Sequence, residues 1–170
     1  NSAVAYNAPP LSAPSPLALT LRQDATDLLA RPELDLKEVT VQHCLIAVRN
    51  RGPFADKPAL SHRDAEEKAA LLFEEAREGG DFRLMVLRNT YDHIFSEAEP
   101  GVLHMFRPDD PKSMPTERTK LDRDKNQYYR DELTRWFWMA SWRLNVGEVG
   151  GIEKSGENSP YGFHIIKRLK

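Results

Sequence analysis

The chain has 170 residues, of which 40% are hydrophobic and 29% charged, a composition typical of a globular protein with one sizeable core. Its formal net charge of −2 lacks the basic excess needed to bind a phosphate backbone, so nucleic acid is excluded as an expected partner. A single cysteine, Cys44, rules out an internal disulfide framework, and no apolar run approaches the roughly 20 residues that span a bilayer.

The lead-in, residues 1–37, differs in composition from the rest of the chain. Residues 1–18 are rich in Pro, Ala and Ser and predict an extended linker. Residues 19–29 have the apolar spacing of a short amphipathic helix, which either packs on the following domain or belongs to a partner module. The chain opens with neither Met nor a basic-then-apolar leader. We therefore expect it to start inside a longer precursor that has lost a signal peptide or membrane anchor.

Residues 39–49 are mostly β-branched and apolar, which predicts a buried strand. Strand alternation places His43 on one face and its neighbour Cys44 on the other. The two side chains therefore cannot form a nucleophilic Cys–His pair with each other. After a loop rich in Gly and Pro, Ser61 is the expected N-cap of a helix that ends at Gly79 and Gly80.

The remaining predicted elements complete a mixed pattern of helices and strands. A second helix is predicted at residues 82–88, a short strand within 100–106, another helix at 136–144, and two closing strands at 149–153 and 163–169. Strands and helices do not alternate here as they do in βαβ units. The order therefore predicts an α+β domain over residues 38–170.

A charged insertion at residues 107–132 interrupts this domain. It holds seven basic and seven acidic residues with almost no aliphatic content, so it cannot bury a core of its own. Tyr128 and Tyr129 are its large apolar side chains. We expect this insertion to form a mobile lid or a partner-docking arm, and the alternative is a solvated loop without a function.

Four separated stretches resemble the parvulin family of peptidyl-prolyl cis/trans isomerases, also called rotamases. They are QHCLIAV, SHRDAEEKAALLFEEAREGGDFRLMVLRNTYD, PGVLHMF and FWMASWRLNVGEVGGIEKSGENSPYGFHIIKRLK, in the order in which the family has them. The resemblance implies a small, mostly antiparallel four-stranded sheet covered by about four helices, with the charged segment inserted.

The resemblance also implies site residues. Their expected catalytic members are His43, Asp92 and His164, and the two histidines are expected to share a proton. Thr90 matches a small polar position near them. The expected substrate-binding residues include an apolar wall for the proline ring, formed by Leu103, Phe106, Leu133 and Phe137. They also include Trp142, at an aromatic core position beside this wall, and Ser141, at a small polar position near the histidines.

This sequence departs from the family pattern at several places. The short strand has Gly101-Val102-Leu103-His104 where Gly-Asp-Leu-Gly is usual, and Asn89 stands where an aromatic residue is common. The crossing after that strand takes 26 residues instead of a few. The basic patch with which some members of the family bind phosphorylated substrates is not evident either. These departures bear on turnover more than on fold.

The implied function is isomerisation of Xaa-Pro bonds in unfolded or extended polypeptides. Twisting a prolyl amide needs no metal, nucleophile or cofactor, and the five histidines show no HExxH spacing. We expect proline-containing polypeptides as partners, a membrane contact only through a missing N-terminal anchor, and a place in the bacterial cell envelope or periplasm, with the cytoplasm as the alternative.

Three alternatives remain open from sequence. In the first, the domain is a non-catalytic peptide-binding or chaperone module on the same scaffold. In the second, it is a spacer that dimerises through its lead-in helix. In the third, which concerns single residues, the two histidines are core side chains with satisfied hydrogen bonds and Asp92 only ends a helix.

Overall fold

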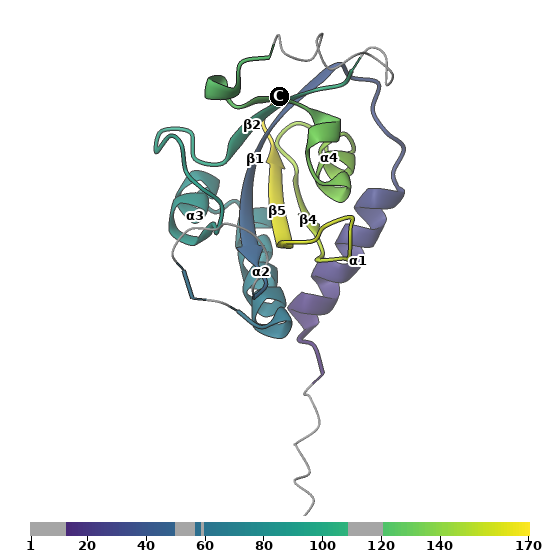
Figure 1. The fold of residues 1–170 in the computed structure, drawn as a ribbon. Helices are drawn as coiled ribbons and strands as arrows, with labels where there is room; N and C mark the ends of the chain where they lie inside the picture. Colours follow the sequence, from purple (N-terminus) through teal and green to yellow (C-terminus); the bar gives the residue numbers. More distant parts are fainter. Residues whose placement is uncertain (1–12, 50–56, 59, 109–120) are drawn as a thin grey trace, which may run out of the picture.

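A computed structural model describes residues 13–49, 57–58, 60–108 and 121–170. Within these residues five strands form one sheet in the order β3-β2-β1-β5-β4. Figure 1 shows β2, β1, β5 and β4 of this sheet with the helices around them. The strands are β1 (Glu38–Ala47), β2 (Val102–Phe106), β3 (Gln127–Tyr129), β4 (Val149–Ile152) and β5 (Gly162–Arg168). The helices are α1 (Pro16–Ala30), α2 (His62–Arg77), α3 (Phe82–Asn89) and α4 (Arg135–Ser141), with 3-10 turns η2 (Arg123–Lys125) and η3 (Arg130–Glu132).

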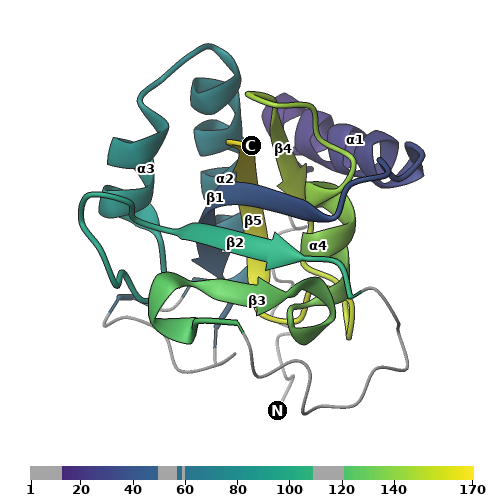
Figure 2. The same ribbon diagram turned by 90° about the horizontal axis from the view of Figure 1, so that it is seen from above.

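The α+β class is confirmed, but the expected four-stranded antiparallel sheet is wrong in detail. The additional strand, β3, comes from the charged insertion and pairs in parallel with β2, from His104 opposite Gln127 to Phe106 opposite Tyr129. Figure 2 shows β3 beside β2 at the edge of the sheet. Residues 121–132 are therefore part of the sheet and its adjoining turns. The lid or docking arm was expected over the whole insertion, 107–132, of which residues 109–120 lie outside the described residues.

Local sequence signals explain where the helices begin. The Ser61 hydroxyl accepts a hydrogen bond from the amide of Asp64 at 3.1 Å, which caps α2 as expected. Asp81 caps α3 in the same way, through the amide of Leu84 at 3.0 Å. Helix α2 is followed by Gly79, whose φ of 91° lies in the left-handed region that favours glycine.

The two faces of the sheet differ in what covers them. Cys44 and Ile46 of β1 and Phe163 of β5 pack with α2 and α3, whereas Val41 and Ile166 pack with α4. Because β1 and β5 are antiparallel with Leu45 opposite His164, the odd-numbered residues of β1 share a face with the even-numbered residues of β5. That face carries both histidines.

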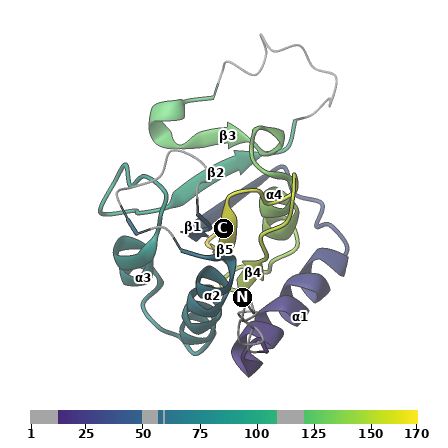
Figure 3. The same cartoon turned by 60° about the horizontal axis from the view of Figure 1, so that its bottom comes forward.

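Helix α1 of the lead-in packs on the domain. Its Leu21 and Leu28 are buried in the two core clusters, and Figure 3 shows α1 next to β4 and α2. Gly150 and Gly151 of β4 permit this approach, because a Cβ at either position would collide with Leu28 or Leu21. The boundary at residue 37 therefore separates two compositions rather than two packed units.

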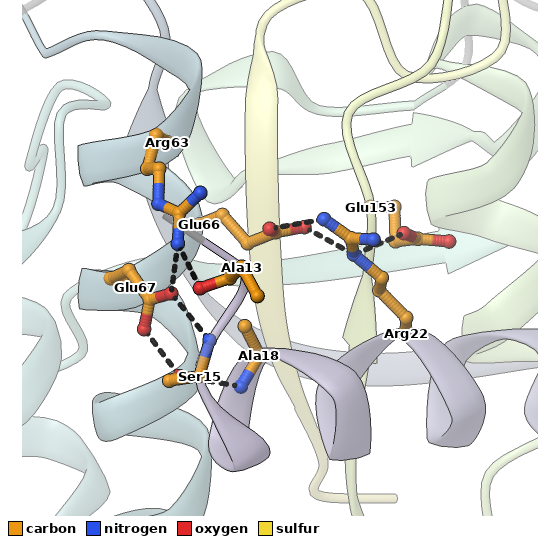
Figure 4. A network of polar contacts seen from close by, with 8 residues as sticks. All are labelled: Ala13, Ser15, Ala18, Arg22, Arg63, Glu66, Glu67 and Glu153. Atoms are coloured by element: carbon orange, nitrogen blue, oxygen red, sulfur yellow. Dashed lines mark hydrogen bonds and ion pairs between the residues drawn. The ribbon is translucent and has the colours of Figure 1, made fainter. Parts of the chain in front are cut away.

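Polar contacts between α1 and α2 reinforce this packing (Figure 4). The Arg22 guanidinium donates to both carboxylate oxygens of buried Glu66, at 2.9 and 2.6 Å. Ser15, the N-cap of α1, donates its amide and hydroxyl to Glu67. Across the described segments, no helix is long and apolar enough to cross a bilayer.

Candidate functional site

Two buried histidines lie side by side on the α4 face of the sheet. His43 of β1 and His164 of β5 are 5% and 6% exposed, and their ring centroids are 5.7 Å apart. The ring of Phe137 from α4 stands edge-on to both, with centroid distances of 5.0 and 5.2 Å. The three rings form a compact aromatic floor supplied by elements that are distant in sequence.

The polar atoms of this floor are left without partners in the described part of the chain. Both ring nitrogens of His164, and Nδ1 of His43, are buried and make no hydrogen bond there. The hydrogen bond through which the two rings were expected to share a proton is therefore absent from the described residues. The two histidines are diagonal neighbours across β1 and β5, and their rings lie side by side with a 34° tilt. Such groups are rare in folded proteins and point to a place that a ligand or water completes.

His164 is held in its neutral form. Burial lowers its pKa to about 3, and the charge of His43 acts in the same direction, while Asp92 opposes both. A neutral imidazole can both donate and accept a hydrogen bond. His164 therefore offers the pocket a polar edge that carries no charge at neutral pH.

Asp92 supplies the charge of the site. Its Oδ2 lies 3.4 Å from Nε2 of His43. Burial acts to raise the pKa of Asp92, but the hydrogen bond and charge of His43 and the amide of His93 outweigh it and leave that pKa below its usual value. The Asp92 side chain is 46% exposed, so an ionised carboxylate stands at the rim, beside an imidazole whose other nitrogen is buried.

Thr90 and Gly101 explain how Asp92 reaches His43. The Thr90 hydroxyl accepts hydrogen bonds from the amides of Leu45 at 3.1 Å and Asp92 at 3.3 Å, and the Tyr91 amide donates to the Leu45 carbonyl at 2.7 Å. The segment after α3 thereby continues the edge of β1 beyond β2. Gly101, directly before β2, has φ of 69°, and a Cβ there would collide with the His43 carbonyl. Only glycine therefore lets the chain pass this close to β1 at His43.

A pocket of about 270 Å³ opens above the aromatic floor. Six of its lining residues were expected from sequence as site residues, and the structure brings them together. They are His43, Asp92, His164, Leu103, Leu133 and Phe137. The other lining residues were missed, namely Leu45, His93, Thr134 and Tyr161. Leu45 was accessible to reasoning, because it lies two residues from His43 on the same face of the strand.

Three expected substrate-binding residues, Phe106, Ser141 and Trp142, do not line this pocket. Phe106 is three residues from Leu103 on β2, so it lies on the opposite face, paired with Glu38 and beside His104. Ser141 is fully buried and donates to the Phe137 carbonyl at 2.8 Å. Trp142, also fully buried, donates its indole N–H to the Leu36 carbonyl at 2.9 Å. Ser141 thus stabilises the last turn of α4, and Trp142 links the end of α4 to the segment before β1.

Comparison with models of known protein families finds no match to this sequence, and comparison with curated proteins finds no similar one. The assignment to the parvulin family therefore remains a prediction. It rests on the four stretches of sequence.

Cys44 lies on the opposite face of β1 from the pocket. Burial raises the pKa of its thiol to about 12, although Lys68, Lys57 and Thr90 act in the other direction. The thiol is therefore protonated and unreactive at neutral pH. In the parts of the chain that the structure describes, no group of three or more His, Cys, Asp or Glu side chains is arranged to hold a metal ion.

Proposed function

We propose that this chain is a peptidyl-prolyl cis/trans isomerase that acts on Xaa-Pro bonds of unfolded or extended polypeptides. The observation that carries the proposal is the pocket itself. Apolar side chains from β2, the segment before α4, and α4 stand around a floor of two buried histidines, with one carboxylate at the rim. The assignment of this activity to the folding of exported proteins in a bacterial cell envelope rests on the sequence alone.

The apolar walls suit a pyrrolidine ring. Leu103, Leu133 and Phe137 offer aliphatic and aromatic surface, and proline is the one residue whose side chain closes on its own amide nitrogen. A pocket that grips this ring holds one side of the prolyl bond while the chain before it turns. No covalent bond is made or broken in this step.

The apolar lining of the pocket supports catalysis of that rotation. Resonance gives the planar amide its charge separation and a rotation barrier of about 18–20 kcal/mol. The twisted amide has lost that resonance, so its carbonyl oxygen carries less negative charge. Apolar walls that exclude water withdraw hydrogen bonds that favour the planar form. Each 1.36 kcal/mol of such a difference changes the rate about tenfold.

The polar residues have distinct roles in this proposal. The ionised Asp92 disfavours negative charge on a neighbouring carbonyl oxygen, which again favours the twisted amide. It also orients the His43 ring through the 3.4 Å contact. Neutral His164, with two nitrogens unpaired within the described residues, can donate to or accept from the substrate backbone.

A second candidate is a module that binds proline-containing peptides without turning them over. The observation that favours it is the absence of a hydrogen bond between His43 and His164 in the described residues. Without that link, the floor resembles a shaped binding surface more than a connected proton network. Both candidates place the proline in the same pocket.

One pair of substitutions tests the proposal and separates the candidates. Removing the wall in Leu133→Ala should lower kcat/KM in a protease-coupled assay on a proline tetrapeptide series by about tenfold, since it removes apolar contact worth 1–3 kcal/mol. The control is Leu71→Ala, a leucine of α2 that is 56% exposed and absent from the pocket.

The outcomes differ for the two candidates. An isomerase accelerates exchange in the wild type, loses rate in Leu133→Ala and is unaffected by Leu71→Ala. A binding-only module shows peptide affinity that falls in Leu133→Ala but no acceleration in any variant. Equal effects of the two substitutions would reject the pocket for both.

A further inference from the structure

The described end of the charged insertion is an ordered unit built on the edge of the sheet. Strand β3 pairs with β2, and the Arg123 guanidinium of η2 forms a two-pronged ion pair with Glu132 of η3, on the other side of β3 in the chain. The Glu132 carboxylate also accepts the Tyr129 amide at 2.8 Å. This segment therefore holds its shape through its own charged side chains, without a core of its own.

Arg130 ties this unit to α4. Its guanidinium carbon lies 4.3 Å from the ring centroid of Trp138 and 4.9 Å from that of Trp142. Its Nη1 also forms an ion pair with Glu33, in the segment that joins α1 to β1. The Arg130 side chain is only 15% exposed, so these contacts are largely removed from water, where cation–π attraction is strongest.

The same residue is directly connected to the pocket wall. The Leu133 amide donates to the Arg130 carbonyl at 3.1 Å, which closes the η3 turn. Leu133 follows this turn and lines the pocket. The position of the Leu133 side chain thus depends on where η3 is held, and η3 is held against α4 by Arg130.

The partners of Arg130 are themselves fixed to the lead-in segment. Trp142 donates its indole N–H to the Leu36 carbonyl, and the Leu34 amide donates to the Trp142 carbonyl at 2.9 Å. Glu33 belongs to the same segment. Arg130 therefore lies where the insertion, α4 and residues 33–36 meet.

We propose that Arg130 is a positioning residue for the pocket: its stack on Trp138 and Trp142 and its pair with Glu33 hold Leu133 against the histidine floor. The insertion then supports the wall of the pocket and sets the affinity of the site for its ligand. The proposal rests on the proposed function for the identity of that ligand, a proline-containing peptide. It does not rest on it for the position of Leu133.

The geometry requires arginine at this position. A guanidinium is planar and can face one indole while its edge reaches a carboxylate, whereas a lysine ammonium is a compact, strongly hydrated charge. Arg130→Lys keeps the charge but loses the stacked plane. Trp138→Phe keeps a ring but weakens the cation–π attraction, and Glu33→Gln removes only the ion pair.

The experiment compares Arg130→Lys with Arg135→Lys, the same substitution at an exposed arginine that begins α4. We expect Arg130→Lys to raise KM for proline tetrapeptides about fivefold with kcat within a factor of two, because a wall that binds ground and transition states alike is loosened. Trp138→Phe and Glu33→Gln should raise KM about twofold to threefold. Arg135→Lys should match the wild type.

The methyl resonances of Leu133, observed by NMR in the peptide-free protein, provide the second readout. They should shift in Arg130→Lys and stay in place in Arg135→Lys. Unchanged Leu133 resonances and an unchanged KM in Arg130→Lys would overturn the proposal, as would a loss of kcat alone. If the wild type accelerates no peptide, the proposed isomerase function fails, and the Leu133 resonances together with peptide affinity still decide the role of Arg130. If Arg130→Lys does not fold, Trp138→Phe and Glu33→Gln decide it by the same two readouts.

Discussion

Two buried polar clusters in this molecule are built on opposite principles. Between α1 and α2, the buried carboxylate of Glu66 is matched on both oxygens by Arg22. Beneath the pocket, His43 and His164 keep three buried ring nitrogens without a partner in the described residues. A cluster whose hydrogen bonds are complete contributes to stability, whereas a cluster whose polar atoms lack hydrogen-bond partners is arranged for a ligand. The difference separates a structural contact from a candidate site without reference to any family.

The largest effect expected from breaking this contrast is at the structural cluster. Arg22→Met leaves the Glu66 carboxylate buried without its partner and should lower the free energy of unfolding by about 3 kcal/mol. Urea denaturation measures this loss. Peptide affinity at the distant pocket should stay at the wild-type value, and a parallel loss of affinity would show that the two clusters are not independent.

His164→Phe should have the opposite effect on stability. It keeps an aromatic ring but removes two buried nitrogens that have no partner in the described chain, so the free energy of unfolding at pH 7 should rise by about 1.5 kcal/mol. Activity should fall in the same variant. A loss of stability together with unchanged activity would make His164 an ordinary core residue.

The gain in His164→Phe should also depend on pH. The folded-state pKa of His164 is lowered to about 3 from an ordinary 6.5, so between these values the unfolded chain binds a proton that the folded one does not. The free energy of unfolding of the wild type therefore does not change through this group above pH 6.5, and it decreases through this group as the pH falls from 6.5 toward 3. The denaturation midpoints of wild type and His164→Phe should thus differ more at pH 4.5 than at pH 7.5. An equal difference at both values would contradict the burial of a neutral imidazole.

The smallest expected effect concerns the link between the pocket and its scaffold. Thr90→Val removes the hydroxyl that accepts from the amides of Leu45 and Asp92, at a cost of about 1 kcal/mol in stability. It should lower kcat/KM about fivefold by displacing the Asp92 carboxylate from His43. Thr90→Ser retains the hydroxyl and should restore both values. If Thr90→Ser behaves like Thr90→Val, the methyl group rather than the hydroxyl is what matters there.

Much of the fold follows from short-range sequence signals. The strand expected at 39–49 is found as Glu38–Ala47, and the helix expected to start after Ser61 runs over His62–Arg77. Both depend on local features, a β-branched run and a capping hydroxyl. The closing strands, found at Val149–Ile152 and Gly162–Arg168, also follow from composition and turn residues.

What sequence reasoning missed depends on non-local pairing. Strand β3 is three residues long and is surrounded by charged residues, so its pattern is too short to be recognised without the edge of β2 that it pairs with. The docking of α1, one of the two alternatives that the sequence left open, depends on Gly150 and Gly151, which are far away in the chain. Arg130 would not be found either, because its partners come from two segments far apart in the chain: Trp138 and Trp142 from α4 and its C-cap, and Glu33 from the segment before β1.

The position of Phe106 on the other face of β2 from Leu103 follows from the strand period. Two residues three apart on one strand face opposite sides, so Leu103 and Phe106 could not both line one pocket on regular β structure. The same rule correctly placed His43 and Cys44 on opposite faces. The strand period is therefore a stronger guide to site membership than position in a resembling stretch.

The most direct test of the central claim is to locate a bound proline by NMR. We expect intermolecular NOEs between the ring protons of a proline tetrapeptide and the side chains of Phe137 and Leu133, with shifts at His43 and His164 as the peptide is added. NOEs confined to other surfaces, with both histidine rings unperturbed at saturation, would contradict the account.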